Sequence, residues 1–177
     1  MRIISGELGG RRLQAPSNLP VRPTTDRAKE GLFNVLSNYL SFEDVSVLDL
    51  FSGTGNISYE FASRGSKNII SVDRNSKCTG FIKKTIKELK IECIQVVNND
   101  VLRYLNEELP VFDLIFADPP YNMEDKKRIA ELIFSNGLLS EEGWFILEHS
   151  KNEDFSKLGN YWSCKKYGEV NFSIFKL

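Results

Sequence analysis

The amino-acid sequence predicts an α/β fold built on a mostly parallel sheet with helices on both faces. From Val45 onward, short and nearly continuous apolar runs alternate with amphipathic segments of helical period. Strands that are apolar on both sides need cover on both faces, which is the condition of strands in parallel sheets. The tail, residues 161–177, has no helical period and breaks at Gly168, so it is expected to close the fold as an antiparallel hairpin.

Length and composition favour one compact, soluble unit. The chain has 177 residues, of which 41% are hydrophobic and 27% charged, and no apolar run approaches the ~18 residues that a membrane helix needs. The opening "MRIISGELGG" lacks the apolar core of a signal peptide, and three scattered cysteines cannot all pair with one another. We therefore expect a cytoplasmic location and no membrane partner.

The first 24 residues are expected to form an extension to the main body. The stretch "RIISGELGGRRLQAP" is typical of a hairpin, and the proline-rich residues 14–24 are typical of an extended connector. The predicted division is 1–24 for this basic hairpin and connector, and 25–177 for the main domain. Residues 1–30 carry six basic and three acidic side chains, although the net charge of the chain is -1. The basic excess is local, and a solvated arm without a ligand is one interpretation of it.

The elements of the main body follow from periodicity. A first helix is predicted at 26–40, behind the polar Thr24 and Thr25 that could cap it. Apolar strand segments then lie at 45–51, 68–73, 93–100, 112–121 and 144–150. Helical patterns separate them at 56–65, 78–90, 101–109 and 125–136. The alternation gives a crossover helix between successive parallel strands.

Acidic residues and a glycine loop gather where these strands end. In open parallel sheets, ligands bind beyond the carboxyl ends of the strands, so function is expected there. The residues delivered to that edge are Asp49 with the loop Gly53-Thr54-Gly55, then Asp73, Asp100, Asp118-Pro119-Pro120-Tyr121 and Glu148.

The loop "FSGTGN" departs from the dinucleotide-binding fingerprint. A full fingerprint needs glycine at position 58, which is Ser58, and Asp49 precedes the loop where it would repel a pyrophosphate. An acid at this place suits a ligand that bears positive charge. A tight turn without any ligand is the alternative interpretation.

Two further strand ends fit the two halves of an adenosine. Asp73 follows the loop by about 20 residues, the position from which a carboxylate accepts hydrogen bonds from both ribose hydroxyls. Asp100 could accept from an adenine amino group or cap the helix that begins near Val101. An adenosine with a cationic end describes S-adenosylmethionine, which is the expected cofactor.

The three segments "VLDLFSGTG", "VD" and "ADPPY", in this order and spacing, resemble the Rossmann-like class I methyltransferases that act on amino groups. The resemblance implies a methyltransferase main domain with a mostly parallel sheet and an antiparallel C-terminal strand. It implies cofactor contacts from Asp49, Phe51, Gly53, Gly55, Asp73, Arg74, Asp100 and Val101. It places the catalytic residues at Asp118, Pro119, Pro120 and Tyr121.

The chemistry of an exocyclic amino group explains the odd strand end "DPPY". The lone pair of such a nitrogen is delocalised into the ring, and acceptors on both amino protons can direct it at the methyl carbon. The Asp118 side chain would be one acceptor and the Pro119 carbonyl the other, while the prolines stiffen the turn. Tyr121 would stack on the base.

The N-terminal stretch "RIISGELGGRRLQAP…VRPTTDRAKEGLFNVL", with "DPPY" and the tail "KKYGEVNFSIF", resembles the RsmD family. Members methylate N2 of one guanine in small-subunit ribosomal RNA, so the resemblance implies this RNA, within a ribosomal particle, as the partner. It implies no metal ion. It places the RNA contacts at Arg2, Arg11, Arg12, Arg22 and Arg27, and it places the "RPT" segment, with Pro23 and Thr24, near the RNA entrance.

The sequence departs from the RsmD pattern at two positions near the cofactor. The family usually has glutamate where Asp73 ends the second strand, and asparagine where this chain has Thr85 in the next helix. A shorter acid is expected to shift the ribose contact or to make it through water. Neither departure touches the reacting centre.

Two other functions share some of these features. Adenine-N6 methylation of DNA would use the same "DPPY" segment and cofactor, but reading base edges normally needs a target-recognition domain for which 177 residues leave little room. A non-catalytic ribosomal RNA-binding assembly factor could keep a vestigial pocket, although a binding protein has no need of a rigid pair of acceptors.

Overall fold

The computed structural model of the chain describes residues 1–16, 19 and 24–177. Arg22, which belongs to the predicted RNA contacts, lies outside the described residues, as does most of the predicted connector. The remaining predicted site residues are all described.

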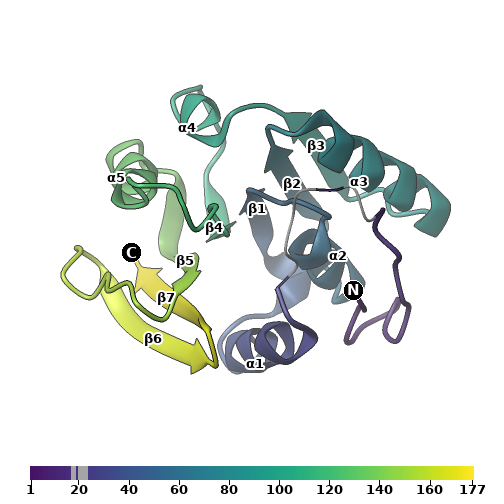
Figure 1. Ribbon diagram of the computed structural model, residues 1–177, viewed down its shortest axis with the longest axis horizontal. Coiled ribbons are helices and arrows are strands. Elements are labelled where there is room, and N and C mark those ends of the chain that lie inside the picture. Colours follow the sequence, from purple (N-terminus) through teal and green to yellow (C-terminus); the bar gives the residue numbers. More distant parts are fainter. Residues whose placement is uncertain (17–18, 20–23) are drawn as a thin grey trace.

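The described strands form one seven-stranded sheet in the order β3-β2-β1-β4-β5-β7-β6 (Figure 1). Their bounds are Ser46–Leu50 for β1, Asn68–Asp73 for β2, Ile94–Asn98 for β3, Phe112–Ala117 for β4, Leu139–Ser150 for β5, Tyr161–Tyr167 for β6 and Val170–Lys176 for β7. Strands β1 to β5 pair in parallel, and β7 lies antiparallel between β5 and β6. The prediction of a mostly parallel sheet closed by an antiparallel hairpin is confirmed.

Helices cover both faces of the sheet (Figure 1). The helices are α1 (Asp26–Leu36), α2 (Asn56–Ser63), α3 (Ser76–Leu89), α4 (Val101–Tyr104) and α5 (Lys127–Ser135), with a short 3-10 helix η1 (Phe42–Asp44) before β1. Val47 packs in the core shared with α1, α2 and α3, whereas its neighbour Leu48 packs in the core shared with α4 and α5. Successive strand residues point to opposite faces, so both must be apolar. In the part of the chain described, no helix is long and apolar enough to span a membrane.

Helix α1 is shorter than the predicted 26–40. Tyr39, near the predicted end of the helix, packs against two tryptophan rings instead of continuing it. The helix ends at Leu36, and Ser37 closes it by donating its backbone N–H to the Phe33 carbonyl. The ring of Tyr39 then lies 5.4 Å from that of Trp144 and 5.6 Å from that of Trp162. Packing of Tyr39 against the sheet outweighs one more turn of helix.

The N-terminal segment folds back on itself, as predicted, but with a single antiparallel bridge rather than two strands. Arg2 bridges Arg12, and the Ile3 backbone N–H donates to the Arg11 carbonyl at 3.0 Å. Ile3 is buried in the core beside α1 and α2. The segment therefore docks on the main body.

A buried lysine joins this segment to two helices. The side chain of Lys29, on α1, has no exposed surface. Its ammonium donates to the Arg2 carbonyl at 2.7 Å and to Asn56 Oδ1 at 2.8 Å, and lies 3.1 Å from Glu60 Oε2. The three donors of an ammonium are thereby matched by three acceptors. Lys29 counts toward the basic excess of the first 30 residues, but its charge is internal and is not available to a ligand.

Glu60, on α2, is the anionic partner of this lysine and is itself fully buried. One carboxylate oxygen accepts the Ile4 backbone N–H at 2.8 Å, and the other accepts the Ser5 N–H at 3.1 Å and the Arg64 Nε at 2.9 Å. Both oxygens are satisfied, which is the condition under which a buried charge is tolerated.

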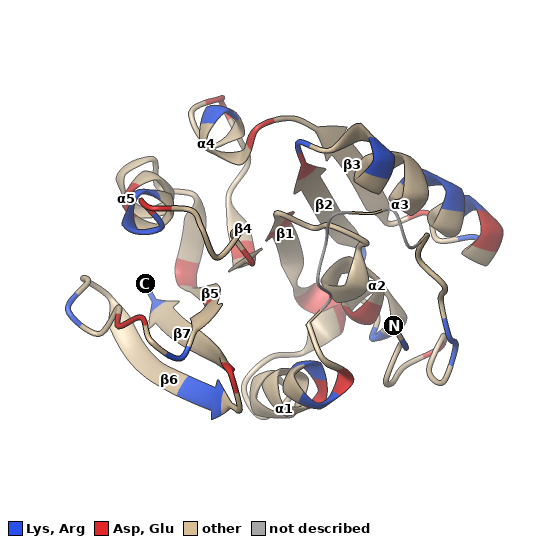
Figure 2. Cartoon of the chain, viewed as in Figure 1, with Lys and Arg blue, Asp and Glu red and all other residues tan. Residues whose placement is uncertain are grey.

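Exposed basic residues follow one side of α3 (Figure 2). They are Lys83, Lys84, Lys87 and Lys90, all solvent-exposed. Lys84 lies 3.8 Å from Glu88 one turn on, in an exposed pair. This face is typical of a solvated helix surface.

Replacing Lys29 with Met should destabilise the protein by about 3–5 kcal/mol, because it removes the ammonium from the buried Glu60 carboxylate. Urea unfolding at pH 7 measures the change. The control is Lys84→Met, whose exposed pair is expected to contribute less than about 1 kcal/mol. Equal effects of the two substitutions would contradict the assigned role of Lys29.

Candidate functional site

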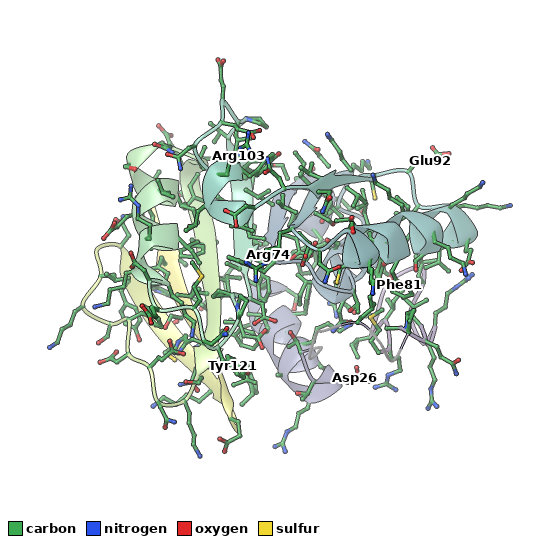
Figure 3. The ribbon with its side chains drawn as sticks, turned by 45° about the horizontal axis from the view of Figure 1, so that its top comes forward. Asp26, Arg74, Phe81, Glu92, Arg103 and Tyr121 are labelled. Atoms are coloured by element: carbon green, nitrogen blue, oxygen red, sulfur yellow. The ribbon has the colours of Figure 1, made fainter. Side chains whose placement is uncertain are left out.

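A cavity of about 340 Å³ lies at the carboxyl ends of the central strands. Of the residues predicted to bind a cofactor, those that line it are Asp49, Phe51, Gly53, Asp73 and Arg74. All four residues of the Asp118 to Tyr121 turn also line it. The sheet register brings these loops together, since Leu50 pairs with Ala117 and Ala117 with Leu147. Figure 3 shows Arg74 and Tyr121 in loops that follow different strands.

The loop after β1 has a strained backbone. Phe51 has φ 58°, a left-handed conformation that is unusual for an aromatic residue, and Gly53 and Gly55 also have positive φ. A Cβ on Gly55 would lie 2.8 Å from the Tyr59 ring, so only glycine fits there. Strain of this kind concentrates at functional sites.

Asp73 stabilises this loop from the end of β2. One of its carboxylate oxygens accepts the Gly53 N–H at 2.8 Å, and the other accepts the Asn75 N–H at 2.8 Å. A carboxylate has acceptor sites for about four hydrogen bonds, so two remain for a ligand in the cavity. The contact of Asp73 with ribose hydroxyls remains a prediction. Its carboxylate, one methylene shorter than the glutamate usual in the RsmD family, is hydrogen-bonded to the loop backbone at Gly53.

Asp49 lies beneath the loop and is 1% exposed. Its carboxylate accepts the backbone N–H of Ser58 at 3.1 Å and also the Ser58 hydroxyl. Burial raises the pKa of Asp49 to about 7, and the nearby Asp73 adds to the rise while the bonds from Ser58 oppose it. At pH 7 the Asp49 carboxyl group is therefore close to half ionised.

Asp118 directly follows β4, and Glu148 occupies the equivalent position in the neighbouring β5, two residues before that strand ends. Each follows the in-register pair Ala117 and Leu147 by one residue, so the two side chains are neighbours on one face of the sheet. Glu148 is 2% exposed, whereas Asp118 is half-buried. Burial raises the pKa of Glu148 to about 7. Burial, and then the charge of Glu148, raise the pKa of Asp118 well above its ordinary value.

Asp49 and Asp118 line the cavity together with Asp73 and Arg74, and Glu148 acts on Asp118 by its charge. Asp49 also contributes to the raised pKa of Asp118, which shows that their charges act on one another. Each raised pKa means that ionisation is unfavourable in the empty protein. A cation in the cavity would lower the free-energy cost of ionising these acids, whereas an anion would raise it. The site suits a ligand with positive charge.

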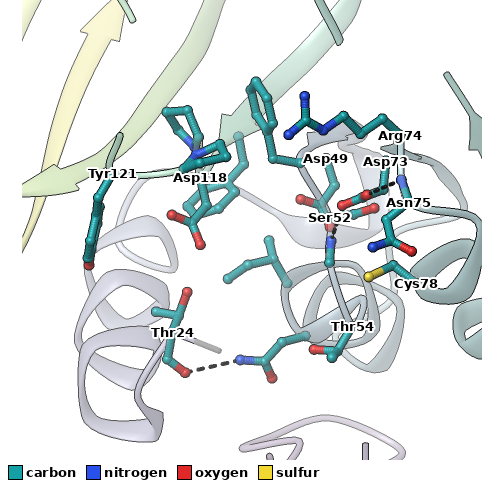
Figure 4. A pocket seen from close by; sticks show the side chains of 17 residues that line it. Thr24, Asp49, Ser52, Thr54, Asp73, Arg74, Asn75, Cys78, Asp118 and Tyr121 are labelled. Atoms are coloured by element: carbon teal, nitrogen blue, oxygen red, sulfur yellow. Dashed lines mark hydrogen bonds between the residues drawn. The ribbon is translucent and has the colours of Figure 1, made fainter. Parts of the chain in front are cut away.

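The turn after β4 is held from outside by a buried lysine. Lys126, at the start of α5, donates to the Tyr121 carbonyl at 3.2 Å and pairs with Glu153 at 2.7 Å. Its ammonium lies 5.8 Å from the centre of the Tyr121 ring, which is 48% exposed. Figure 4 shows Tyr121 at the edge of the cavity beside Asp118. An exposed ring fixed at its backbone can offer a stacking surface.

The structure does not bring every predicted residue to the cavity. Asp100 caps α4 by accepting the Arg103 N–H at 3.1 Å. Val101, the first residue of α4, packs in the core on that face of the sheet. Gly55 acts through the loop backbone, and Thr85 is buried in α3. None of the four lines the cavity. The cofactor contacts assigned to Asp100 and Val101 remain predictions.

The arginines predicted to contact RNA lie on the surface where they are described. Arg2, Arg11, Arg12 and Arg27 are exposed. Arg2 lies 3.6 Å from Asp26 in an exposed pair, which contributes little energy. Their role is untested by these contacts and stays a prediction.

Thr24 and Asn56 line the cavity, although the sequence did not predict them as site residues. Thr24 is 7% exposed, and its hydroxyl donates to Glu148 Oε2 at 2.8 Å. Its carbonyl accepts from Asn56 Nδ2 at 3.2 Å (Figure 4). The RsmD resemblance places Thr24 near the RNA entrance, and its position before a helix suggests a cap, but neither signal indicates the bond to Glu148.

Two further observations bear on what the cavity can hold. Ser52 lines it and has a buried hydroxyl without a hydrogen-bond partner in the described structure. Among the described residues, no group of three or more histidine, cysteine, aspartate or glutamate side chains is arranged to hold a metal ion. Buried hydroxyls are normally hydrogen-bonded, so Ser52 is available to a polar ligand.

Comparison with known proteins finds relatives along the whole chain. The family model described as "Conserved hypothetical protein 95" matches residues 1–176. A protein of Bacillus subtilis (strain 168), named "Putative rRNA methyltransferase YlbH", is 36% identical over 183 residues, which cover 99% of this chain and 98% of that protein.

"Ribosomal RNA small subunit methyltransferase D" of Escherichia coli (strain K12) is 28% identical over 179 residues, which cover 99% of this chain and 89% of that protein. The structure of "Putative methyltransferase yhhF" from Escherichia coli superimposes with a TM-score of 0.86 at 28% identity, covering 99% of this chain and 97% of that one. These likenesses confirm the predicted fold class and the resemblance to the RsmD family.

Replacing Asp49 with Asn should stabilise the ligand-free protein more at pH 8 than at pH 5, by about 2 kcal/mol. The Asp49 pKa rises from 3.8 to about 7 on folding, so its contribution to stability is complete below pH ~4 and is lost as the pH rises through about 7. Asparagine can still accept both bonds from Ser58. Urea unfolding at the two pH values measures this, and a gain that is larger at pH 5 would contradict it.

Proposed function

The chain belongs to the family described as "Conserved hypothetical protein 95", and on that premise we propose that it transfers a methyl group from S-adenosylmethionine to the exocyclic N2 of a guanine in small-subunit ribosomal RNA. The observation that carries the proposal is the Asp118-Pro119 turn beside a cavity with buried carboxylates. The names of the relatives from Bacillus subtilis and Escherichia coli support the same reaction class and RNA.

The residues of the cavity fit S-adenosylmethionine. A volume of about 340 Å³ lies within the usual range of small-molecule sites, and the Ser52 hydroxyl is an unused polar group. The buried Asp49 suits the positive charge of the ligand, Gly53 allows close backbone approach, and Asp73 has acceptor capacity for ribose hydroxyls. When bound, this cofactor supplies an electrophilic methyl group on a cationic sulfur.

The turn after β4 orients the nucleophile. Asp118 and the carbonyl of Pro119 accept the two amino protons of the base, so that the nitrogen lone pair points out of the ring plane toward the methyl carbon. The cofactor would supply the methyl group by exchange of its C–S bond for a new C–N bond, and the proton lost from the amino nitrogen would pass to the Asp118 carboxylate, whose pKa is raised. The ionised Asp118 carboxylate stabilises the positive charge that develops on that nitrogen.

The surface around the cavity supports an RNA substrate. Tyr121 is exposed at the edge and can stack on an unpaired base, which is how enzymes commonly hold a base taken out of its helix. Exposed Arg11 and Arg12 lie on the N-terminal segment. A chain of net charge -1 with a local basic arm suits a folded ribosomal particle in the cytoplasm better than bulk attraction to free RNA.

Replacing Asp118 with Ala should lower the rate of methyl transfer to ribosomal particles by about 10²–10³-fold or more, because one of the two acceptors on the amino group is lost. The dissociation constant of S-adenosylmethionine should change far less. Transfer of a radiolabelled methyl group and equilibrium binding of the cofactor measure the two effects.

The matched control is Glu124→Ala, which removes an exposed acid from the same loop and should leave transfer unchanged. An Asp118→Ala enzyme with normal activity would refute the proposed role of the turn.

Reversing charge on the N-terminal segment should weaken RNA binding without affecting the cofactor. The double change Arg11→Glu with Arg12→Glu is expected to weaken binding about tenfold or more and to reduce the slope of log affinity against log salt by about 2. The matched control is Lys83→Glu with Lys84→Glu on the solvated face of α3. If the α3 change weakened binding as much as the arm change, the arm would not be the RNA contact.

A further inference from the structure

The Thr24 hydroxyl has one hydrogen-bond polarity when Glu148 is ionised. Its hydrogen is donated to Glu148 Oε2 at 2.8 Å, and above the Glu148 pKa of about 7 the carboxylate can only accept. Thr24 is 7% exposed and Glu148 is 2% exposed, so little water competes for this bond. With its hydrogen committed to Glu148, the Thr24 oxygen has only lone pairs left to offer another partner.

The position of Thr24 is fixed from a second side. Its carbonyl accepts from Asn56 Nδ2 at 3.2 Å, and Asn56 Oδ1 in turn accepts from the buried Lys29 ammonium at 2.8 Å. Capping of α1 does not depend on Thr24, because the neighbouring Thr25 side chain accepts the Ala28 N–H at 3.2 Å. The Thr24 side chain is therefore held in place without serving the helix.

Thr24 faces the same part of the cavity as the proposed reacting centre. Thr24 and Asp118 both line the cavity, and Figure 4 shows the Thr24 hydroxyl directed toward the Asp118 carboxylate. Glu148 lies beside Asp118 on the adjacent strand. A base whose amino group lies against Asp118 and Pro119 would present the neighbouring ring position to this wall.

That neighbouring ring position distinguishes the bases. On the Watson–Crick edge of guanine, the ring nitrogen beside the N2 amino group is N1–H, a hydrogen-bond donor, whereas N3, on the other side of N2, is an acceptor that lies toward the sugar. In adenine and cytosine, the ring nitrogen beside the exocyclic amino group is a lone-pair acceptor. An acceptor on the protein therefore favours guanine and repels the other two.

We propose that Thr24 selects guanine by accepting the N1–H of the target base, and that Glu148 is a positioning residue that fixes the direction of the Thr24 hydroxyl. The proposal rests on the proposed function and adds to it the residue that chooses the base. Buried polar groups left without their partner by the wrong substrate are an effective source of discrimination.

The test compares guanine with 2-aminopurine, which keeps the N2 amino group but has a lone pair at N1. Small-subunit particles are reconstituted with RNA that carries either base at the target position, and methyl transfer is measured for each. For the wild-type protein we expect a preference for guanine of about 100-fold or more. The ratio of preferences between variants cancels the intrinsic difference in reactivity between the two bases.

Thr24→Val keeps the shape of the side chain but removes the acceptor, and we expect it to lower the guanine preference at least tenfold. Thr24→Ser should retain the wild-type preference, because it retains the hydroxyl. Glu148→Met frees the hydroxyl to donate, so methylation of 2-aminopurine should rise above the wild-type rate. Thermal unfolding and cofactor binding of each variant establish that the fold and the cofactor site are intact.

The matched control is Thr25→Val, which removes the cap of α1 and should lower stability by weakening the helix while leaving the base preference unchanged. A folded Thr24→Val protein with the wild-type preference for guanine would overturn the inference and leave the proposed function standing. A wild-type protein that methylates no guanine in the particles would instead refute the proposed function itself.

Discussion

The structure depends most on the concentration of carboxylates at the carboxyl edge of the sheet. Parallel pairing of β1, β4 and β5 brings Asp49, Asp118 and Glu148 to one face, where burial raises the pKa of each acid and the charges of Glu148 and Asp49 raise that of Asp118 further. In a folded protein this arrangement is a cost, since each ionised group lies in an unfavourable place. A cationic ligand lowers the free energy of ionising these acids, and this gain adds to its binding free energy. An acid at the end of the apolar strand β4 is accounted for in this way.

A second buried charge cluster is built on the opposite principle. Lys29 and Glu60 satisfy one another and the backbone of the N-terminal segment, so this cluster holds the fold together without any ligand. The two clusters are joined by hydrogen bonds from Lys29 through Asn56 and Thr24 to Glu148. The segment that carries the exposed arginines is thus connected by hydrogen bonds with the wall beside Asp118, which links the proposed RNA-binding surface to the proposed reacting centre.

The order of strands and helices was predictable because two-sided burial leaves a simple pattern, as at Val47 and Leu48. The edge that holds Asp49 and Asp118 followed from the rule that ligands bind beyond the carboxyl ends of parallel strands. Pairwise side-chain geometry was not predictable: the sequence counts Lys29 as one more basic residue of the N-terminal segment, and only the packing of α1 on α2 shows that it is buried. Thr24 likewise gained its place from Glu148, a residue 124 positions away.

The most direct test of the central claim is the number of protons released when the cofactor binds. Calorimetric titration at pH 7 in buffers of different ionisation enthalpy gives this number for S-adenosylmethionine and for S-adenosylhomocysteine, which has the same amino acid end but no positive charge on sulfur. If the buried acids are ionised by the cation, S-adenosylmethionine should release more protons than S-adenosylhomocysteine, by on the order of one per site. Equal release by the two ligands would contradict the claim that the carboxylates form a site for a cationic methyl donor.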